Sequence, residues 1–519
     1  MKNCFSYVGS LCLIIIFLYG TFEVLASPRI NLKDCKHVHQ LPRIDPEYAG
    51  IVLPPNIAPL NFIINERGTK YYMRIVSNEG DPIEIFSGTP KIVIPLKKWR
   101  ELLKLNRGQE VHFEIFIRDK EGSWKQFDPI INQISHENID GYLVYRIINP
   151  AYLLWKIMGI FQRDIQSFDE KPLLLNRATD GNCMNCHNFC NNDPENMMLH
   201  LRGGQASGTL ITQNGKIVKV NTATKFNKAG AYPSWHPNGN IIAYSVNKLE
   251  MFFHAIGEPR DVLDRESDLI LYQIDSNTIT TNPLIADPER METFPSWSPD
   301  GQYLYFCSAP KFELYIAGES YLYDQILYDL MRIRYNAEDG TWGRLETVLS
   351  SSETGLSMTM PRVSPDGRYL LFCTAKCGNF PVYIPDSDLF LMDLNTGEYC
   401  RLQINSDQAD TFHSWSSNSR WFVFSSKRRD GICARPYFAY VDEKGNVHKP
   451  FVMPQEDPTF YGTFLKTYNV PELIKGPVQV RPQKLVKTAY DNAKKINAKL
   501  DPAVTYLRAQ KEDKTIGIE

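Results

Sequence analysis

Two cysteines and one histidine, Cys183, Cys186 and His187, stand together in the order C-x-x-C-H. Two thiols at this spacing can form thioether bonds to the two vinyl groups of one porphyrin, and the next residue then lies beneath the iron. The pattern predicts a single covalent haem c, attached at Cys183 and Cys186, with His187 as the proximal iron ligand. Arg177 and Arg202 are candidates for neutralising the haem propionates.

The residues after this motif supply candidates for a distal iron ligand, namely His200, Met197 and Met198. We expect His200 to bind the iron, and His236 is a more distant candidate. Each has a structural alternative, because a histidine can be bonded to the backbone and methionines commonly fill apolar cores. A five-coordinate iron with an open face is a further alternative.

The same segment permits two interpretations without haem. Cys183, Cys186, His187 and Cys190 follow the order C-x-x-C-H-x-x-C, and four such ligands can close a structural zinc site. In an exported protein, Cys190 can instead pair with Cys35 in a disulfide. The sequence leaves these alternatives open beside the haem.

Haem attachment requires export, and residues 1–27 have the features of a secretory signal peptide. Lys2 precedes an apolar run at 8–19, and the small residues Ala26 and Ser27 follow it. The run is short for a transmembrane helix, and an uncleaved anchor is the alternative. We expect a secreted or periplasmic protein, attached to the cell envelope at most peripherally, with no integral membrane segment after signal removal.

Length and composition limit the number of domains, the kinds of partner and the fold class that we expect. A chain of 519 residues is long enough for two or three domains. Its 57 basic and 59 acidic residues nearly balance, which gives no reason to expect binding to nucleic acid. Short apolar runs separated by Pro and Gly, of which there are 33 and 31, indicate a mainly β protein.

Four internal repeats start at residues 230, 292, 358 and 410. The second one, 292–301, has the sequence E-T-F-P-S-W-S-P-D-G, and each repeat continues into an apolar strand. Pro, Asp and Gly in this order favour a tight turn. Pro presets φ, the Asp side chain bonds the local backbone, and Gly permits a positive φ. Two further strands follow in each repeat, and four antiparallel strands make one blade of a β-propeller.

These repeats resemble the secreted bacterial TolB-like, or WD40-like (PD40), propellers, whose blade signature is W-S-P-D-G-x-x-L-x-F. The resemblance covers about residues 205–470 and implies a propeller of five or six blades. The fourth repeat departs from the signature, with Ser417 for Pro and Ser419 for Gly. We expect a partial blade at 208–221 to be completed by a C-terminal strand near 460–466. The C-x-x-C-H motif is similar to that of cytochromes c, without the cytochrome fold.

The remaining segments complete the predicted organisation: a β-sandwich-like domain at 28–150, a haem-motif linker at 151–204, the propeller at 205–470 and a C-terminal helical tail at 471–519. The tail helix is expected at 484–499, where apolar residues have helical spacing. Cys307 and Cys373 occupy the same place in two repeats and are expected to be small buried residues on inner strands.

Two functional hypotheses follow. The first is an exported haem c protein in which a propeller covers the cofactor, for electron transfer or redox sensing with a redox or envelope protein partner. The second is a non-redox propeller that binds a protein or glycan partner, with the Cys/His cluster as a zinc or disulfide staple. The chain has no hydrolase or transferase motif, so any catalysis is expected to be a haem-dependent redox activity.

Overall fold

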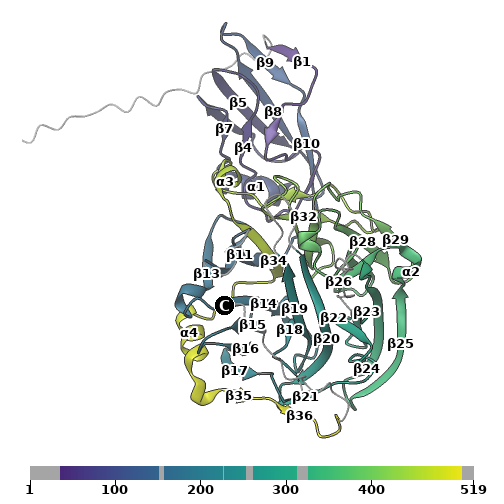
Figure 1. Cartoon of the computed structure of the whole chain (residues 1–519). Coiled ribbons are helices and arrows are strands. Elements are labelled where there is room, and N and C mark those ends of the chain that lie inside the picture. The colour runs from purple at the N-terminus through teal and green to yellow at the C-terminus, as the bar shows by residue number, and fades with distance from the viewer. Residues whose placement is uncertain (1–34, 151–156, 226, 253–260, 312–324, 505–519) are drawn as a thin grey trace, which may run out of the picture.

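The computed structural model describes residues 35–150, 157–225, 227–252, 261–311 and 325–504. The predicted signal peptide, residues 1–27, lies outside this part. The described chain forms a β-sandwich placed on one side of a larger β-propeller (Figure 1). The predicted mainly β fold, with an N-terminal sandwich and a propeller, is therefore confirmed.

The sandwich consists of two sheets and one helix, α1 (Leu96–Leu105). The larger sheet has the order β1-β9-β8-β10-β3, in which β5 also pairs with β8 and β6 pairs with β5, and the smaller sheet has the order β2-β4-β7. Their bounds are β1 (Lys36–Val38), β2 (Ile44–Asp45), β3 (Val52–Leu53), β4 (Phe62–Ile64), β5 (Lys70–Ser77), β6 (Ile83–Ser87), β7 (Lys91–Ile92), β8 (Glu110–Arg118), β9 (Trp124–Phe127) and β10 (Ile130–Ile134).

Six sheets of the described chain form the propeller blades, and the strands of each blade run in order from the innermost to the outermost. Blade 1 is β14 (Cys183–Phe189), β15 (Met197–Arg202), β16 (Gly208–Gln213) and β17 (Lys216–Asn221). Blade 2 is β18 (Ala231–Trp235), β19 (Ile241–Phe252), β20 (Asp261–Gln273) and β21 (Thr278–Thr280). Blade 3 is β22 (Arg290–Trp297), β23 (Tyr303–Pro310), β24 (Asp329–Asn336) and β25 (Thr341–Leu349).

Blade 4 is β26 (Ser357–Val363), β27 (Tyr369–Ala375), β28 (Asp388–Asp393) and β29 (Tyr399–Arg401). Blade 5 is β30 (Asp410–Trp415), β31 (Trp421–Ser426), β32 (Arg435–Tyr440) and β33 (Phe451–Val452). Blade 6 is β34 (Thr467–Ile474), β11 (Tyr142–Ile148), β12 (Gly159–Asp164) and β13 (Glu170–Leu175). The inner strands contact one another in sequence, and β34 contacts both β30 and β14, which closes the ring. Two short helices, α2 (Ser351–Thr354) and α3 (Phe460–Thr463), lie in connections.

The structure divides the chain differently from the sequence-based division. The segment assigned to a haem-motif linker, 151–204, contains β12 and β13 of blade 6 and the two inner strands of blade 1. The strands at 208–221 belong to this complete blade 1. The C-terminal strand that closes the ring is β34, and it pairs with β11 instead of completing the 208–221 segment. A blade split between the two ends of the chain removes the free sheet edges that an open ring would have.

Each inner strand is interrupted by a bulge at the same position. One residue there adopts a positive φ in each strand, and the six are Cys186, Tyr232, Phe294, Met360, Phe412 and Val470. The register with the second strand shifts at these residues, as expected for a β-bulge that redirects the side chains beside it. The blade turns are also similar in geometry. Ser419 in the fourth repeat has φ 62° and Gly301 in the second has φ 73°.

The C-terminal tail differs in part from its prediction. Helix α4 (Pro482–Tyr490) buries Leu485 and Ala489, but it ends before the expected boundary at 499. The chain then becomes extended, and β35 (Ile496–Asn497) and β36 (Lys499–Leu500) pair in parallel with the outer strands β17 and β21. These pairings provide hydrogen-bond partners for backbone groups on two exposed blade edges. We infer that these hydrogen bonds stabilise the tail more than a longer helix α4 would.

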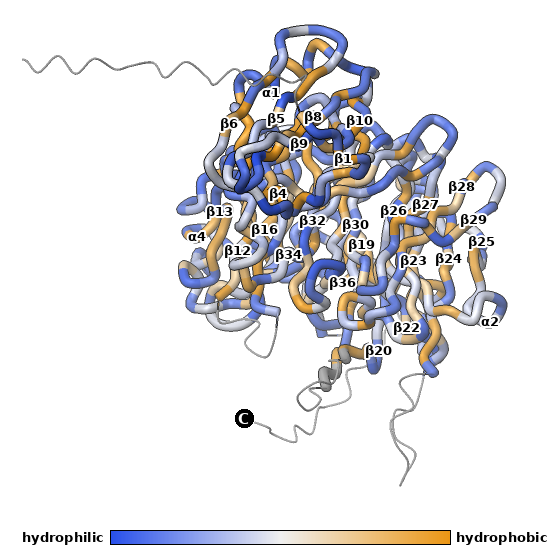
Figure 2. Tube along the Cα trace, turned by 90° about the horizontal axis from the view of Figure 1, so that it is seen from above, coloured by the Kyte–Doolittle hydropathy of each residue, from blue (hydrophilic) through white to orange (hydrophobic). Residues whose placement is uncertain are grey.

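The sandwich and propeller share one continuous apolar core. Trp99 and Phe113 of the sandwich belong to the same buried cluster as Trp421 of blade 5 and Tyr468 of blade 6. Seen from above, the hydrophobic segments follow the strands and the hydrophilic segments lie at the outer turns (Figure 2). No helix among the described residues has the length and apolar character to cross a bilayer.

Candidate functional site

The inner strands enclose a cavity of about 140 Å³ on the propeller axis, which we call the axial cavity. All six bulges face it, because the positive-φ residue of every inner strand lies on its wall. Tyr232, Phe294 and Phe412 make one part of the wall aromatic, and Phe380 and Tyr383 from a loop of blade 4 extend that part. The charged and polar part of the wall includes Arg146, Asn185, His187, His413 and Asn469.

A second cavity of about 360 Å³ lies further along the axis, and we call it the wide chamber. Arg362 and Glu472 line both cavities and form an ion pair of 2.7 Å between them. Glu472 also accepts hydrogen bonds from Ser414 at 3.1 Å and from Asn188 at 3.3 Å. This polar network separates the aromatic axial cavity from the wide chamber.

The bulge of blade 1 places Cys186 and His187 on the wall of the axial cavity. Cys186 has φ 55°, and its Sγ accepts a hydrogen bond of 3.4 Å from the backbone N–H of Tyr232 in the next blade. Cys183 lies at the start of the same strand, opposite Arg202, and is half-buried without lining the cavity. Burial raises the pKa of the Cys183 thiol, although Arg146 and Arg202 act in the other direction.

The imidazole of His187 is almost completely buried, with 1% exposure. Neither of its ring nitrogens makes a hydrogen bond among the described residues. Burial, and then the nearby Arg146 guanidinium, lower its pKa to about 3, while the carbonyl groups of Val144 and Val470 oppose this shift. The ring is therefore neutral at neutral pH and keeps a nitrogen lone pair available to a metal ion.

Arg146 is a charged residue of the cavity wall that the sequence analysis missed. It donates a hydrogen bond of 2.9 Å to the carbonyl of Met184 and another to the side chain of Asn469, which ties blade 6 to blade 1. Its sequence signal was a single arginine within the apolar run 142–148. Arg202 is half-buried and close enough to act on Cys183, whereas Arg177 lies in an exposed position of a 3-10 turn.

The predicted distal ligands do not line the axial cavity. His200 lies on β15 opposite Asn185, and its Nδ1 is 2.9 Å from the hydroxyl of Thr209. Burial lowers its pKa to about 3. Met197 and Met198 are fully buried in two different core clusters. Successive side chains of a strand point to opposite faces, so the two methionines cannot face a common ligand.

His236, the more distant candidate, is also occupied elsewhere. Its Nε2 donates a hydrogen bond of 3.1 Å to the carbonyl of Gly301, and its Nδ1 accepts one of 3.2 Å from the N–H of Asn238. Its ring packs edge-on against Trp297. This histidine therefore connects the turns of two neighbouring blades.

The four-ligand zinc site of the alternative interpretation is not assembled in the described residues. Cys190 lies 3.6 Å from the carbonyl of His236, in the core between blades 1 and 2. No disulfide joins two of the described cysteines, so the described structure does not contain a Cys35–Cys190 bond. A set of His, Cys, Asp or Glu with ligand atoms close together does occur in the described chain, but it consists of His37, His39 and Asp128 in the sandwich.

The axial cavity presents only part of the donor set that a c-type haem requires, because Cys183 does not line it. Cys186 offers a thiol and His187 an unbonded imidazole on the same wall, and Arg146 supplies a positive charge beside them. The volume of about 140 Å³ is nevertheless below the range of about 300–1,000 Å³ that is common for ligand sites. A porphyrin therefore requires displacement of part of the aromatic wall.

Comparison with protein-family models and with curated protein sequences gives no match. The resemblance to TolB-like proteins therefore stays a prediction. Three solved structures that match are the Dos1 propeller, a propeller domain of Cps50 (Swd1) from Myceliophteria thermophila, and a prolyl endopeptidase.

The chain is 14% identical to Dos1 with a TM-score of 0.27, and the match covers 46% of this chain and 65% of that one. The chain is 10% identical to Cps50 with a TM-score of 0.29, and the match covers 50% of this chain and 69% of that one. It is 13% identical to the prolyl endopeptidase with a TM-score of 0.35, and the match covers 75% of this chain and 50% of that one. These similarities concern the propeller fold alone.

Proposed function

We propose that this chain is an exported propeller protein that carries one c-type haem, attached at Cys183 and Cys186 and bound through His187, for electron transfer or redox sensing in the cell envelope. The observation that carries the proposal is the position of His187. Its imidazole is buried on the wall of the axial cavity and neutral at physiological pH, and although the carbonyls of Val144 and Val470 lie nearby, neither ring nitrogen has a well-aligned hydrogen bond among the described residues. Buried polar groups are otherwise nearly always bonded.

The surrounding residues support this role. The backbone N–H of Tyr232 holds the sulfur of Cys186 at the cavity wall. The guanidinium of Arg146 is fixed by its hydrogen bond to Met184 and leaves its Nε, also buried, without a partner. When bound, a c-type haem supplies one-electron redox chemistry. The wall then sets its potential through burial and through the charge of Arg146.

Access is expected through the loop of blade 4 that carries Phe380 and Tyr383. These two rings stack with centroids 6.0 Å apart and cover the cavity from a short 3-10 turn, Pro381–Tyr383. The rest of the aromatic wall belongs to inner strands that are held on both sides by neighbouring blades. The loop is thus the part of the wall that can move with the least disruption of the fold.

The test compares two histidines that occupy equivalent places. Wild-type protein, His187→Ala and His413→Ala are produced in an exporting host with an active haem-attachment system, and their absorption spectra and haem staining are measured. We expect covalent haem and the same absorption spectrum in the wild type and in His413→Ala, and a changed Soret absorption in His187→Ala, because the iron there loses its proximal ligand. Colourless wild-type protein, or equal spectra for the two variants, would contradict the proposal.

A second candidate function is the binding of a polar ligand, such as a glycan, in the wide chamber. Its volume of about 360 Å³ lies within the usual range for ligand sites. Trp235 and Trp297 line it, and their buried indole N–H groups have no hydrogen-bond partner among the described residues. Screening of glycans against the wild type and a Trp235→Phe variant, which removes one N–H donor, tests this candidate independently of haem.

A further inference from the structure

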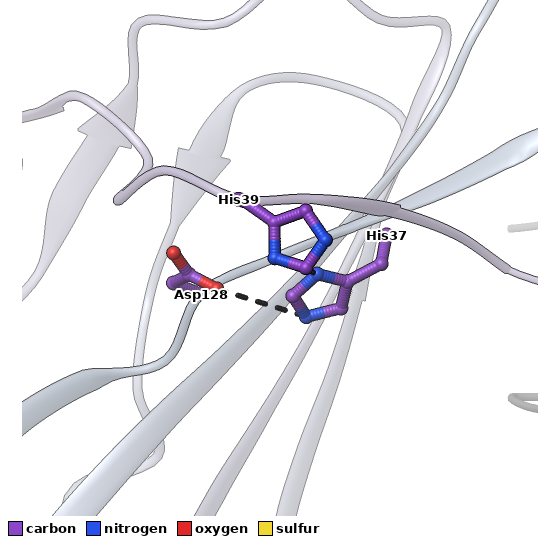
Figure 3. A group of neighbouring side chains, drawn as sticks. All are labelled: His37, His39 and Asp128. Atoms are coloured by element: carbon purple, nitrogen blue, oxygen red, sulfur yellow. Dashed lines mark hydrogen bonds and ion pairs between the residues drawn. The ribbon is translucent and has the colours of Figure 1, made fainter.

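A second group of metal-binding residue types lies in the sandwich, far from both cavities. His37 is on β1, His39 follows this strand, and Asp128 follows β9 (Figure 3). β1 pairs in parallel with β9, with His37 opposite Gln126. The chain bends at His39, and one ligand atom from each of the three side chains comes within reach of the others.

The distances in this group suit chelation. The Nδ1 atoms of His37 and His39 are 3.2 Å apart, and one ligand atom from each of the three residues lies within 4.8 Å of the others. Two nitrogen ligands at 2.0–2.1 Å from a tetrahedral zinc ion are separated by about 3.3 Å. The imidazole pair therefore has this spacing at its Nδ1 atoms, whereas the carboxylate of Asp128 lies 3.7 Å from Nε2 of His37 and has to move towards the Nδ1 side of that ring.

The ordinary interactions of these residues are a hydrogen bond of 3.2 Å between the Nδ1 atoms of the two exposed imidazoles and a long ion pair. The pair His37–Asp128 is long, at 3.7 Å, and both side chains are 40% exposed. An exposed ion pair of this kind contributes little to stability. Two imidazoles with ring centroids 4.4 Å apart repel each other when both are protonated, whereas a shared metal ion removes the repulsion.

We propose that His37, His39 and Asp128 bind one divalent transition-metal ion, Zn²⁺ or more tightly Cu²⁺. Imidazole and carboxylate ligands suit these ions, and the affinity rises from zinc to copper for a given ligand set. Exposure leaves room for water at the remaining coordination positions. The ion joins β1, an edge strand of three residues, to the end of β9, so it stabilises the place where the chain enters the sandwich.

The first experiment measures zinc stoichiometry on the full chain, by competition with a chromophoric chelator. The variants are His37→Ala/His39→Ala and the control His112→Ala. His112 lies 3.1 Å from Glu110 in the same sheet, but the described structure places no second histidine in that pair. We expect the wild type and His112→Ala to bind one more Zn²⁺ per chain than the double variant.

The second experiment uses Cu²⁺ and electron paramagnetic resonance. We expect a signal with two nitrogen donors in the wild type and its loss in the double variant, with unchanged thermal unfolding of the metal-free proteins. Equal zinc stoichiometry in all three proteins, or an unchanged copper signal, would overturn the proposal. Zinc or haem at Cys183 and Cys186 would be retained by the double variant, so this result is distinguishable from failure of the proposed function.

Discussion

The inner strands of blade 1 and blade 5 place the same residue type at the same position with different surroundings. His187 follows the bulge residue Cys186, and His413 follows the bulge residue Phe412. Both rings are buried, and burial is the main reason that both pKa values fall to about 3.

The two histidines differ in their bonds. Nε2 of His413 donates a hydrogen bond of 2.9 Å to the carbonyl of Leu371, and its Nδ1 lies 3.6 Å from the sulfur of Cys373. In blade 6, Val144 and Arg146 take the places of Leu371 and Cys373; the carbonyl of Val144 lies near His187 but makes no well-aligned hydrogen bond with it. Burial alone thus does not distinguish a structural histidine from a candidate ligand, whereas hydrogen bonding does.

The largest expected effect concerns stability. In protein produced without haem, His413→Ala should lower the free energy of unfolding by about 2–4 kcal/mol, because it leaves the carbonyl of Leu371 unbonded and creates a cavity. His187→Ala should cost less than half as much, since no hydrogen bond is lost at an existing cavity. Denaturant unfolding measures both. Equal losses would show that His187 is bonded in the same way as His413.

The two histidines share a lowered pKa, and the pH dependence of stability measures the effect of this shift. Their folded-state pKa of about 3 lies below the ordinary value of 6.5, so unfolded chains take up protons first on acidification. Stability is therefore full above pH 6.5 and falls towards pH 3, by about 1.4 kcal/mol per pH unit for each histidine. In haem-free protein, His187→Gln and His413→Gln should each reduce this slope by about 1.4 kcal/mol per pH unit, because each removes one group that binds a proton only in the unfolded chain. An unchanged slope in either variant would show that its ring is accessible to protons.

The smallest expected effect concerns the sulfur next to His413. Cys373→Ala removes this contact and a buried thiol, whereas Cys307→Ala removes a buried thiol at the equivalent position of blade 3, with Leu330 as its partner in the next strand. The free energy of unfolding should fall by about 0.5–1 kcal/mol more for Cys373→Ala than for Cys307→Ala. Equal values would mean that the thiol does not help to hold the His413 ring.

The sequence predicted blades 2 to 5 because their turns carry strong local chemistry. The turn is Pro-Asp-Gly in blades 3 and 4 and Pro-Asn-Gly in blade 2, and it fixes where the second strand begins; the aligned repeat locates the variant turn of blade 5. The two inner strands of blade 1 were missed because Asn191 and Asn192, both at positive φ, replace that turn. Blade 6 was missed because its strands come from distant parts of the chain, and such pairing depends on the closed ring and leaves no local signal.

The candidate site could be predicted in part for the same reasons. Cys186 and His187 form a local motif, and the structure brings both to the axial cavity. Proximity in sequence misled the choice of distal ligands, since strand β15 turns His200 towards Thr209. The aromatic wall was present in the aligned repeats as the column of Tyr232, Phe294, Met360 and Phe412, but the importance of this column depends on the bulge, which is visible only in three dimensions.

The most direct test of the central claim is the intact mass of the wild-type protein, exported in a host with and without an active haem-attachment system. We predict a mass increase of one haem per chain in the first host, lost when Cys183 and Cys186 are both replaced by serine and kept when Cys307 and Cys373 are replaced instead. An unmodified mass in both hosts would contradict the account and leave His187 as an unbonded histidine on the wall of the axial cavity.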